Sequence, residues 1–386
     1  MSTPSLSLRT CAAAASFALW IAAAPAGAVL PADHLKAEVL PSPPHPHWVY
    51  AVDIVFGEMT EGKIVLIDGD TRRMLGMIST GMTVGFAPSP DQKELYVTDT
   101  FYSRGTRGDR TDVVTIVSTD ELKPIAEVPI PPKRFLSLTV PYGTITTPDG
   151  RFLLVFNFTP ATSVSVVDLK SRKFVGEIAT PGCSLAYPAQ DSRGFSMLCA
   201  DGHLLTVRLD DTGASTGQKV SDRRFFDPEK ESLNVTPARL GAHYFFISFL
   251  GLVHGLDLSG VAPAFDEPWS LLSDADRRAG WRPGGWQESA VNRALNRLYV
   301  VMHRGGNGTH KDPGPEVWSY DLATHRRIQR IRMKTPVTGV LTSLDDQPLL
   351  YGLGADSSVQ VYDARTGTYR GSAKGLLQTS VVLANP

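Results

Sequence analysis

A turn followed by three short apolar runs recurs along most of this 386-residue chain. In the clearest copy, Thr147-Pro148-Asp149-Gly150 predicts a turn, since Pro fixes φ and Gly accepts a positive φ. Behind it lie three runs of β-branched and aromatic residues that favour strands: Phe152–Asn157, Val164–Asp168 and Lys173–Ile178. One such unit cannot bury both of its faces, so neighbouring copies must stack against it.

Seven copies of the pattern can be marked by the residue that ends the third expected strand of each unit. The markers are Asp68, Ser118, Asp168, Leu209, Asp257, Asp321 and Asp363. They lie about 40 to 65 residues apart, the range of four-stranded propeller blades. The sequence therefore predicts an all-β fold, a seven-bladed β-propeller of four-stranded antiparallel blades over residues 48–386. The Asp markers are expected to cap turns rather than form a carboxylate ring, because they hold equivalent repeat positions.

The two ends of the expected propeller carry their own signals. Ser380-Val381-Val382-Leu383 is a lone strand signal, and we expect it to close the ring by pairing into the first blade. Residues 29–47 form a proline-rich arm, which cannot join a central strand. The arm either stays loose as a leader or docks on a partner.

Residues 1–28 have the features of a cleaved signal peptide. Arg9 precedes an apolar core, Ala12 to Ala24, and Ala26-Gly27-Ala28 has the small-x-small form of a cleavage site. The core is shorter than the roughly twenty apolar residues of a membrane anchor. We therefore expect export, with a soluble mature chain that begins near Val29.

Export determines how the cysteines are interpreted. Cys11 leaves with the signal peptide, and Cys183 and Cys199 remain in an oxidising compartment. We expect them to form a structural disulfide, which would stabilise the fold by roughly 3 kcal/mol. A redox-active pair is the alternative, but the close Cys-x-x-Cys spacing is missing.

Charge and motifs exclude several function classes. The formal net charge is −1, so no basic footprint for nucleic acid is visible. No Gly-x-Ser-x-Gly, His-Glu-x-x-His, phosphate loop or Cys-x-x-Cys-His sequence occurs, and no residue is singled out as catalytic. His303 and His310 flank a Gly-rich loop, where a metal site is conceivable, but solvated histidines are the favoured interpretation.

One segment interrupts the repeat. Residues 268–280 predict a short helix, with Asp and Ser at its start and Arg at its end. The helix leads into Trp281, Arg282 and Trp286, which are residue types that supply much of the binding energy at interfaces. From spacing alone, a core position for one of the tryptophans is equally consistent.

The chain resembles the large (heavy) subunits of quinoprotein amine dehydrogenases, methylamine dehydrogenase and more closely aromatic amine dehydrogenase. The resemblance covers nearly the whole mature chain. It is carried by these segments: Asp53-Ile54-Val55-Phe56 with Thr60-Glu61, Tyr102 to Val114, Pro131-Pro132-Lys133-Arg134, Ser163 to Asp168, Cys183 and Cys199, Pro268 to Leu272, Trp281 to Trp286, and Gly308-Thr309-His310-Lys311.

This resemblance implies a periplasmic seven-bladed propeller that joins a small, disulfide-rich subunit in a two-plus-two heterotetramer. It places the tryptophan tryptophylquinone cofactor and the catalytic base in the small subunit, so that this chain holds neither. A primary amine is oxidised to an aldehyde with release of ammonia, and electrons pass to a small copper protein. Phe56 matches the large-subunit Phe that lines the substrate channel; the alternative for Phe56 is a plain apolar residue at a strand end.

Two function classes stay open from the sequence. The first is the non-catalytic subunit of an amine dehydrogenase. The second is a free-standing periplasmic propeller that binds a ligand, or carries a lactonase-like activity, on its axial face. The residues Gly57-Glu58-Met59 beside Phe56 differ from both relatives, so the amine is not identified.

Overall fold

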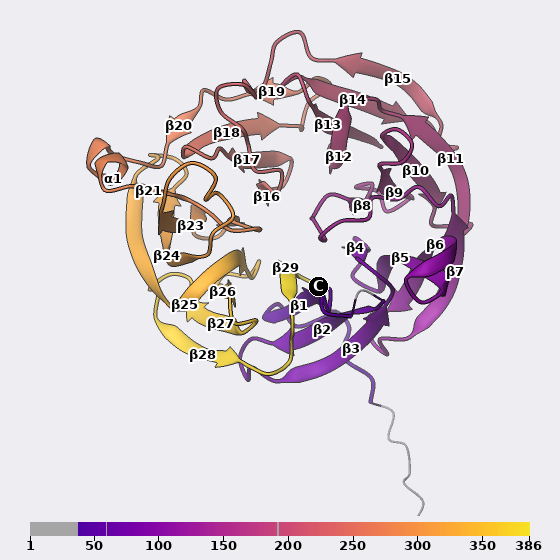
Figure 1. Cartoon of the computed structure of the whole chain (residues 1–386), viewed down its shortest axis with the longest axis horizontal. Coiled ribbons are helices and arrows are strands. Elements are labelled where there is room, and N and C mark those ends of the chain that lie inside the picture. Colours follow the sequence, from indigo (N-terminus) through magenta and orange to yellow (C-terminus); the bar gives the residue numbers. More distant parts are fainter. Residues whose placement is uncertain (1–37, 59, 191–192) are drawn as a thin grey trace, which may run out of the picture. The chain divides into compact units, whose positions relative to one another are not determined.

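The computed structural model describes residues 38–58, 60–190 and 193–386, and the expected signal peptide lies outside this part of the chain. Val39–Pro386 forms one compact unit. Its strands form antiparallel sheets that stand around a central axis, as a β-propeller (Figure 1). Among the described residues, no helix is long and apolar enough to cross a membrane.

The first three sheets each have four strands, ordered from the axis to the rim. The first contains β29 (Ser380–Ala384), β1 (Trp48–Asp53), β2 (Gly62–Asp68) and β3 (Met74–Thr80). The second contains β4 (Gly85–Pro88), β5 (Glu94–Arg104), β6 (Arg107–Ser118) and β7 (Pro124–Ile130). The third contains β8 (Thr144–Thr146), β9 (Phe152–Asn157), β10 (Ser163–Asp168) and β11 (Lys173–Ala179).

The next two sheets continue around the axis. The fourth contains β12 (Cys183–Pro188), β13 (Gly194–Cys199), β14 (Leu204–Leu209) and β15 (Ser215–Val220). The fifth contains β16 (Ala238–Leu240), β17 (His243–Ile247), β18 (Leu252–Asp257) and β19 (Ala264–Phe265), with β20 (Trp269–Ser270) also paired to β18.

The remaining strands form one eight-stranded sheet. It contains β21 (Trp281–Pro283), β22 (Ser289–Asn292), β23 (Arg297–Arg304), β24 (Gly314–Asp321), β25 (Arg327–Thr342), β26 (Leu349–Gly354), β27 (Val359–Asp363) and β28 (Tyr369–Ala373). The sheet is continuous because β25 pairs with β24 over its first half and with β26 over its second half. The described strands therefore form six sheets rather than seven separate ones, and the count of seven blades stays a prediction.

The burial of each strand follows its place in the sheet. The middle strands β9 and β10 are buried at every residue, because neighbouring sheets cover both of their faces. In the outer strand β11, exposed residues alternate with partly buried residues and the buried Ile178. This explains why the sequence shows continuous apolar runs for the middle strands and a weaker pattern for the outer ones.

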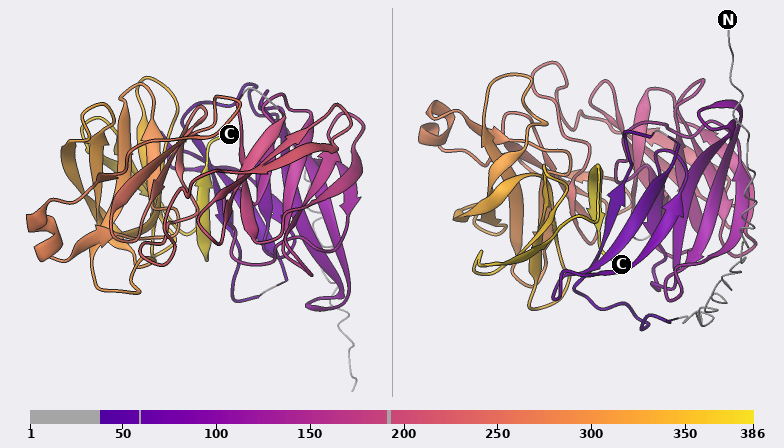
Figure 2. Two further views of the ribbon diagram at one scale, coloured as in Figure 1. Left: turned by 90° about the horizontal axis from the view of Figure 1, so that it is seen from above. Right: turned by 60° about the horizontal axis from the view of Figure 1, so that its bottom comes forward.

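The C-terminal strand closes the ring, as predicted. β29 pairs antiparallel with β1, with Val382 opposite Val52 and Leu383 opposite Ala51. Figure 2 shows this yellow strand beside the indigo strands from the start of the chain. The pairing joins the two ends of the propeller sequence in one sheet, in which β29 is the strand nearest the axis.

The described part of the proline-rich arm lies along the propeller. The amide of Leu40 donates to the carbonyl of Asp120, and the Leu40 side chain packs against the core of the first two sheets. The carbonyl of His47 accepts hydrogen bonds from the amide of Gly69 and the hydroxyl of Tyr351. These contacts fix residues 45–47 at the start of β1.

Turns between the third and outer strands lie at one end of the blades, here called the turn face (residues 69–73, 169–172, 322–326 and 364–368). Each is capped by the Asp that ends the preceding strand: Asp168 Oδ1, for example, accepts from the amides of Lys170 (2.9 Å) and Ser171 (3.1 Å). Equivalent bonds are made by Asp68, Asp321 and Asp363. The Asp markers are turn caps, as predicted.

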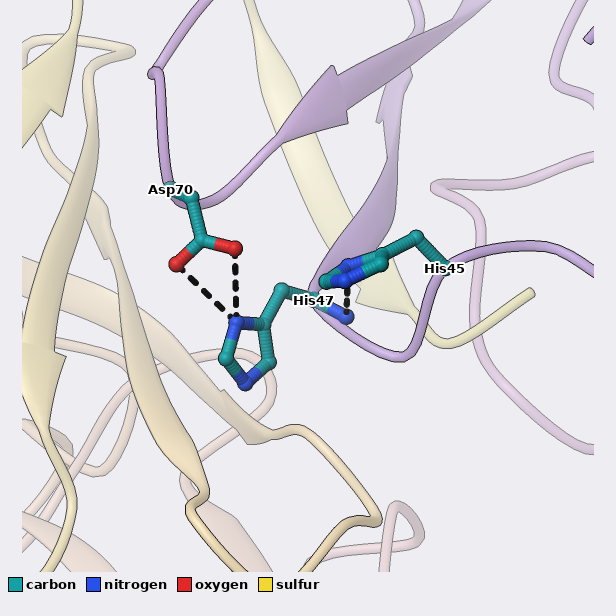
Figure 3. A group of neighbouring side chains, drawn as sticks. All are labelled: His45, His47 and Asp70. Atoms are coloured by element: carbon teal, nitrogen blue, oxygen red, sulfur yellow. Dashed lines mark hydrogen bonds and ion pairs between the residues drawn. The ribbon is translucent and has the colours of Figure 1, made fainter. Parts of the chain in front are cut away.

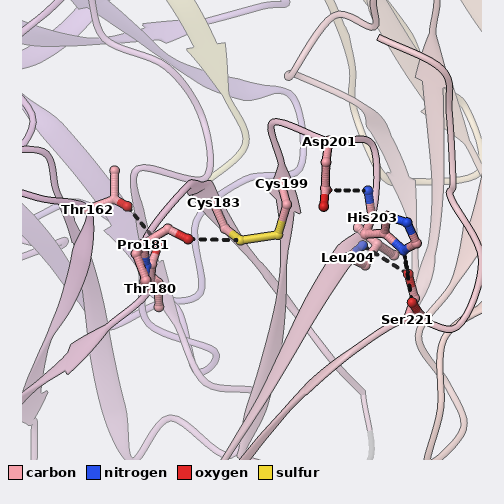
Figure 4. The surroundings of a disulfide bond; sticks show 9 residues. All are labelled: Thr162, Thr180, Pro181, Cys183, Cys199, Asp201, His203, Leu204 and Ser221. Carbon is pink, nitrogen blue, oxygen red and sulfur yellow. Dashed lines mark hydrogen bonds between the residues drawn. A yellow bond between two sulfur atoms is a disulfide. The ribbon is translucent and has the colours of Figure 1, made fainter.

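Cys183 and Cys199 form a disulfide that joins β12 to β13, as predicted (Figure 4). The two residues are directly opposite each other in the ladder. The predicted helix is shorter than expected: α1 covers only Asp274–Arg278, and Trp269–Ser270 forms β20 instead. Ser273 begins α1 with a capping box to Asp276, and Gly280 follows its end with φ 74°.

Candidate functional site

Loops that join the second and third strands lie at the end of the blades opposite the turn face, because these strands are antiparallel and the blades repeat the same order. We call this end the hairpin face and define it by residues 54–58, 101–107, 158–162 and 248–251. Neighbouring loops on it are close: a Cβ atom at Gly105 would lie 3.9 Å from Cγ2 of Thr60.

Four large apolar side chains on the hairpin face are exposed to solvent. Phe56 is 55% exposed, Phe101 44%, Phe158 57% and Leu250 47%. Each comes from a different sheet. They include all three phenylalanines that are exposed among the described residues. Exposed aromatic side chains gathered at one end of a fold are typical of a surface that a partner covers.

Phe56 follows β1 on a turn that is held by Asp53. The buried carboxylate of Asp53 accepts from the amide of Val55 (3.1 Å) and from the amides of Gln378 (2.6 Å) and Thr379 (2.8 Å). Val55 has φ 45°, a conformation that a β-branched residue rarely adopts. This turn directs Phe56 away from the core, so Phe56 is not a buried residue at a strand end.

A buried charge cluster supports the loops of the second sheet. Asp112 accepts from the guanidinium of Arg110 through two bonds, of 2.9 and 2.7 Å, and from the amide of Arg134 at 3.1 Å. The Arg134 guanidinium donates to Thr100 and to the carbonyls of Met82 and Thr83. Burial lowers the pKa of Arg134 to about 10. The resemblance to the amine dehydrogenases included these residues, but their role as a support was not predicted.

Trp281 lies in the core, the alternative that spacing had left open. It is 7% exposed and packs 5.0 Å from the ring of Trp318. The guanidinium groups of Arg304 and Arg330 cover its ring at 5.1 and 4.6 Å. These arginines leave the indole little surface for a partner subunit.

Trp286 and Arg282 are only half-buried. The indole Nε1 of Trp286 donates to the carbonyl of Thr139 (2.8 Å), and Lys311 lies 4.3 Å above the ring. Two residues later in the chain, Glu288 is fully buried, and burial raises its pKa to about 8. Arg282 donates to the carbonyl of Gly306. Trp286 also packs against the core of the first two sheets, so each of the two residues keeps part of its surface exposed.

The two candidate histidines occupy different environments. His303 is buried within β23 against Gly284, so the expectation that it is solvated was wrong. His310 stacks on Phe249 at 3.8 Å, and burial and Lys311 hold its pKa below the usual value. A cavity of about 310 Å³ beside His310 is lined by residues that include Leu250 and Arg282. Among the described residues, neither histidine belongs to a group of three metal-ligand side chains.

The sequence model of the methylamine dehydrogenase heavy chain family (MADH) matches residues 47–384. The chain belongs to this family. The methylamine dehydrogenase heavy chain of Methylophilus methylotrophus is 31% identical over 83% of this chain and 78% of its own length. That of Methylorubrum extorquens is 32% identical over 79% of this chain and 74% of its own length. The resemblance predicted from the sequence is confirmed at the level of the family, while the closer likeness to aromatic amine dehydrogenase stays a prediction.

Solved structures show the same fold at low identity. Hydrazine synthase from Kuenenia stuttgartiensis has a TM-score of 0.53 at 14% identity and covers 78% of this chain and 89% of its own. A candidate 6-phosphogluconolactonase from Bacteroides uniformis has a TM-score of 0.59 at 14% identity, over 90% of this chain and 99% of its own. At such identities the likeness concerns the propeller architecture alone.

Proposed function

We propose that this chain is the large subunit of an amine dehydrogenase that oxidises primary amines to aldehyde and ammonia. Family membership over residues 47–384 is the observation that carries the proposal. The chain itself contributes no catalytic residue. Its contribution is to hold a small subunit in place and to form part of the path by which the amine reaches it.

The cofactor of this proposal, tryptophan tryptophylquinone, belongs to the small subunit. When bound there, the quinone would accept the electrons that the amine loses. The electrons would then pass to a small copper protein. The residues of this chain do not fit a cofactor of that kind. Trp281 and Trp318 are neighbours, but Trp318 is fully buried and arginines cover Trp281, so no amine could reach either ring.

We assign the contact with the small subunit to the hairpin face, in a two-plus-two heterotetramer. Phe56 is the proposed wall of the substrate channel, because it is exposed on a turn that Asp53 fixes. Arg282 and Trp286 are proposed interface residues, since both are half-buried and contact the loop between β23 and β24, through Gly306 and Lys311. The buried Trp281 would act on the interface only indirectly, by supporting β21.

The finer features of the fold belong to the same proposal. We propose seven blades, because the two halves of β25 can serve as the outer strand of a sixth blade and the inner strand of a seventh. We further propose a signal peptide over 1–28, an arm over 29–47 and the propeller over 48–386, with the mature protein in the periplasm. Neither nucleic acid nor a membrane is a proposed partner.

Purification of the native protein tests the function directly. We expect a small, cysteine-rich chain to co-purify and to show quinone absorbance that amine bleaches. The large chain alone should fold and show no amine-dependent dye reduction. Robust amine turnover by the pure large chain would exclude the subunit role. A fully monomeric native protein without a small chain would favour the alternative, a free-standing propeller with a ligand or lactonase-like function.

A further inference from the structure

Two histidines of the N-terminal arm lie beside Asp70, in the turn between β2 and β3 (Figure 3). One nitrogen each from His45 and His47 and one oxygen of Asp70 all lie within 4.8 Å of one another. The two imidazole rings are 5.3 Å apart and nearly perpendicular, at 79°. We propose that these three side chains bind a divalent transition-metal cation such as Zn²⁺.

The donor set suits this class of ion. Imidazole nitrogens and a carboxylate oxygen are common zinc ligands, with bonds of about 2.0–2.2 Å and donor atoms about 3.3 Å apart in a tetrahedral site. His47 Nδ1 already lies 2.8 Å from an Asp70 oxygen. His45 is exposed and can turn toward them, exchanging its hydrogen bond from the His47 amide (3.2 Å) for a metal bond. The fourth position would be left to water.

The second ring nitrogen of His47, Nε2, contacts a carboxylate, as it does in many metal-binding histidines. Its Nε2 lies 3.2 Å from a carboxylate oxygen of Asp345, which is itself fixed by Ser343 Oγ and the amide of Gln347. A carboxylate on the second ring nitrogen orients a ligating imidazole and makes it more basic. The main chain of His47 is fixed as well, through the hydrogen bonds of Gly69 and Tyr351 to its carbonyl.

The charges around the site favour a cation. Asp70 and Asp345 supply two carboxylates, and the neighbouring Arg72 supplies one guanidinium, which donates to the carbonyl of Asp70. With both imidazoles neutral, the cluster carries a negative charge. A bound ion would link the arm to the β2–β3 turn and, through Asp345, to the turn between β25 and β26. It would thereby stabilise the region where the ring closes.

The test is a calorimetric titration with Zn²⁺ of the untagged mature protein, stripped with a chelator and carrying any small subunit that accompanies it. We expect one ion per large chain, with affinity lowered at least about tenfold by His45→Ala and by Asp70→Asn. Asp345→Asn, which leaves the three ligands in place, should lower affinity by about 10–100-fold. His243 pairs with Asp266 at 2.8 Å and serves as the control, so His243→Ala should leave the affinity unchanged.

The same titration can overturn the site. No heat of binding, or binding that the double variant His45→Ala/Asp70→Asn leaves unchanged, would exclude it. Both residues are exposed, so the variants should keep the circular dichroism of the parent protein. A melting temperature that rises with Zn²⁺ in the parent and not in the double variant would support the link between arm and ring. The site lies on the turn face, and its presence does not depend on capture of a small subunit.

Discussion

The hairpin face and the turn face are built from the same strands, yet their loops are held in different ways. On the turn face, an Asp at the strand end accepts the amides of the short turn that follows, so each turn stabilises itself. On the hairpin face, buried carboxylates such as Asp53 and Asp112 hold the loops from beneath. Phenylalanines project from these loops into solvent. Support of this kind agrees with an end of the molecule that presents side chains to a partner.

The largest effect should come from removing the support beneath the hairpin face. Asp112→Ala would leave the guanidinium of Arg110 and the main-chain amide of Arg134 without their acceptor, and breaking a buried ion pair costs about 3–5 kcal/mol. Urea unfolding measures this loss. Asp211→Ala, in the corresponding turn between β14 and β15, removes only an exposed pair with Arg193 and should leave stability almost unchanged. Equal losses in the two variants would contradict the comparison.

The disulfide at the hairpin-face end of the fourth sheet should have the next largest effect. Replacement of Cys183 and Cys199 by Ser opens a loop with a sequence separation of 16 and should cost about 3 kcal/mol. Reduction of the parent protein is the matched control and should lower its stability to that of the variant. The unfolded, unreduced parent should show no free thiol, and titration of two thiols would exclude the bridge.

Much of the fold followed from the sequence, because it depends on local patterns. The seven markers each end a strand in the structure. The strand that closes the ring and the Cys183–Cys199 disulfide are also where the sequence predicted them. The surface was harder to predict. Trp281 and Trp286 are five residues apart in one short stretch of the sequence, which does not distinguish them. Trp281 is the buried one because Trp318, Arg304 and Arg330 pack around its ring.

Long-range contacts also explain what the sequence could not show. The exposure of Phe56 depends on Asp53 binding the amides of Gln378 and Thr379, more than 320 residues away. The cluster of His45, His47 and Asp70 depends on the arm returning to a turn that follows β2. Neither contact has a periodic signal, since each joins a single side chain to a distant loop.

Substitution of Phe56 tests whether this side chain lines the substrate channel or supports the fold. Phe56→Ala should leave stability almost unchanged, because the ring is 55% exposed, while the ratio of kcat/KM between a small aliphatic and an arylalkyl amine shifts by an amount equivalent to about 1–3 kcal/mol. Steady-state kinetics of the assembled complex measure the ratio. Val261→Ala, an exposed apolar residue in the turn between β18 and β19 and outside the hairpin face, is the control and should leave the ratio unchanged. An unaltered ratio in Phe56→Ala would remove Phe56 from the channel.

The smallest effect among the test variants, a loss of stability, is expected for Asp168→Asn on the turn face. The pH dependence of this loss shows whether it comes from the charge of the carboxylate. Burial pushes the pKa of Asp168 up, but the amide of Ser171 and the guanidinium of Arg151 outweigh it, so the pKa lies below the usual value. The charged form therefore contributes stability that is complete above about pH 4 and is lost as the pH falls through the folded-state pKa. Asp168→Asn should cost about 1 kcal/mol at pH 7.

Urea unfolding at pH 7 and at pH 3 measures the free energy of unfolding of the parent and of Asp168→Asn. The difference between the two proteins should be smaller at pH 3. A difference that stays constant would mean that Asp168 acts through shape rather than charge. Small-subunit capture at pH 7 should be the same for both proteins, because a self-contained turn cap has no bond to the opposite end of the blade. Weakened capture in Asp168→Asn would show that the two faces are coupled, and the contrast between them would then fail.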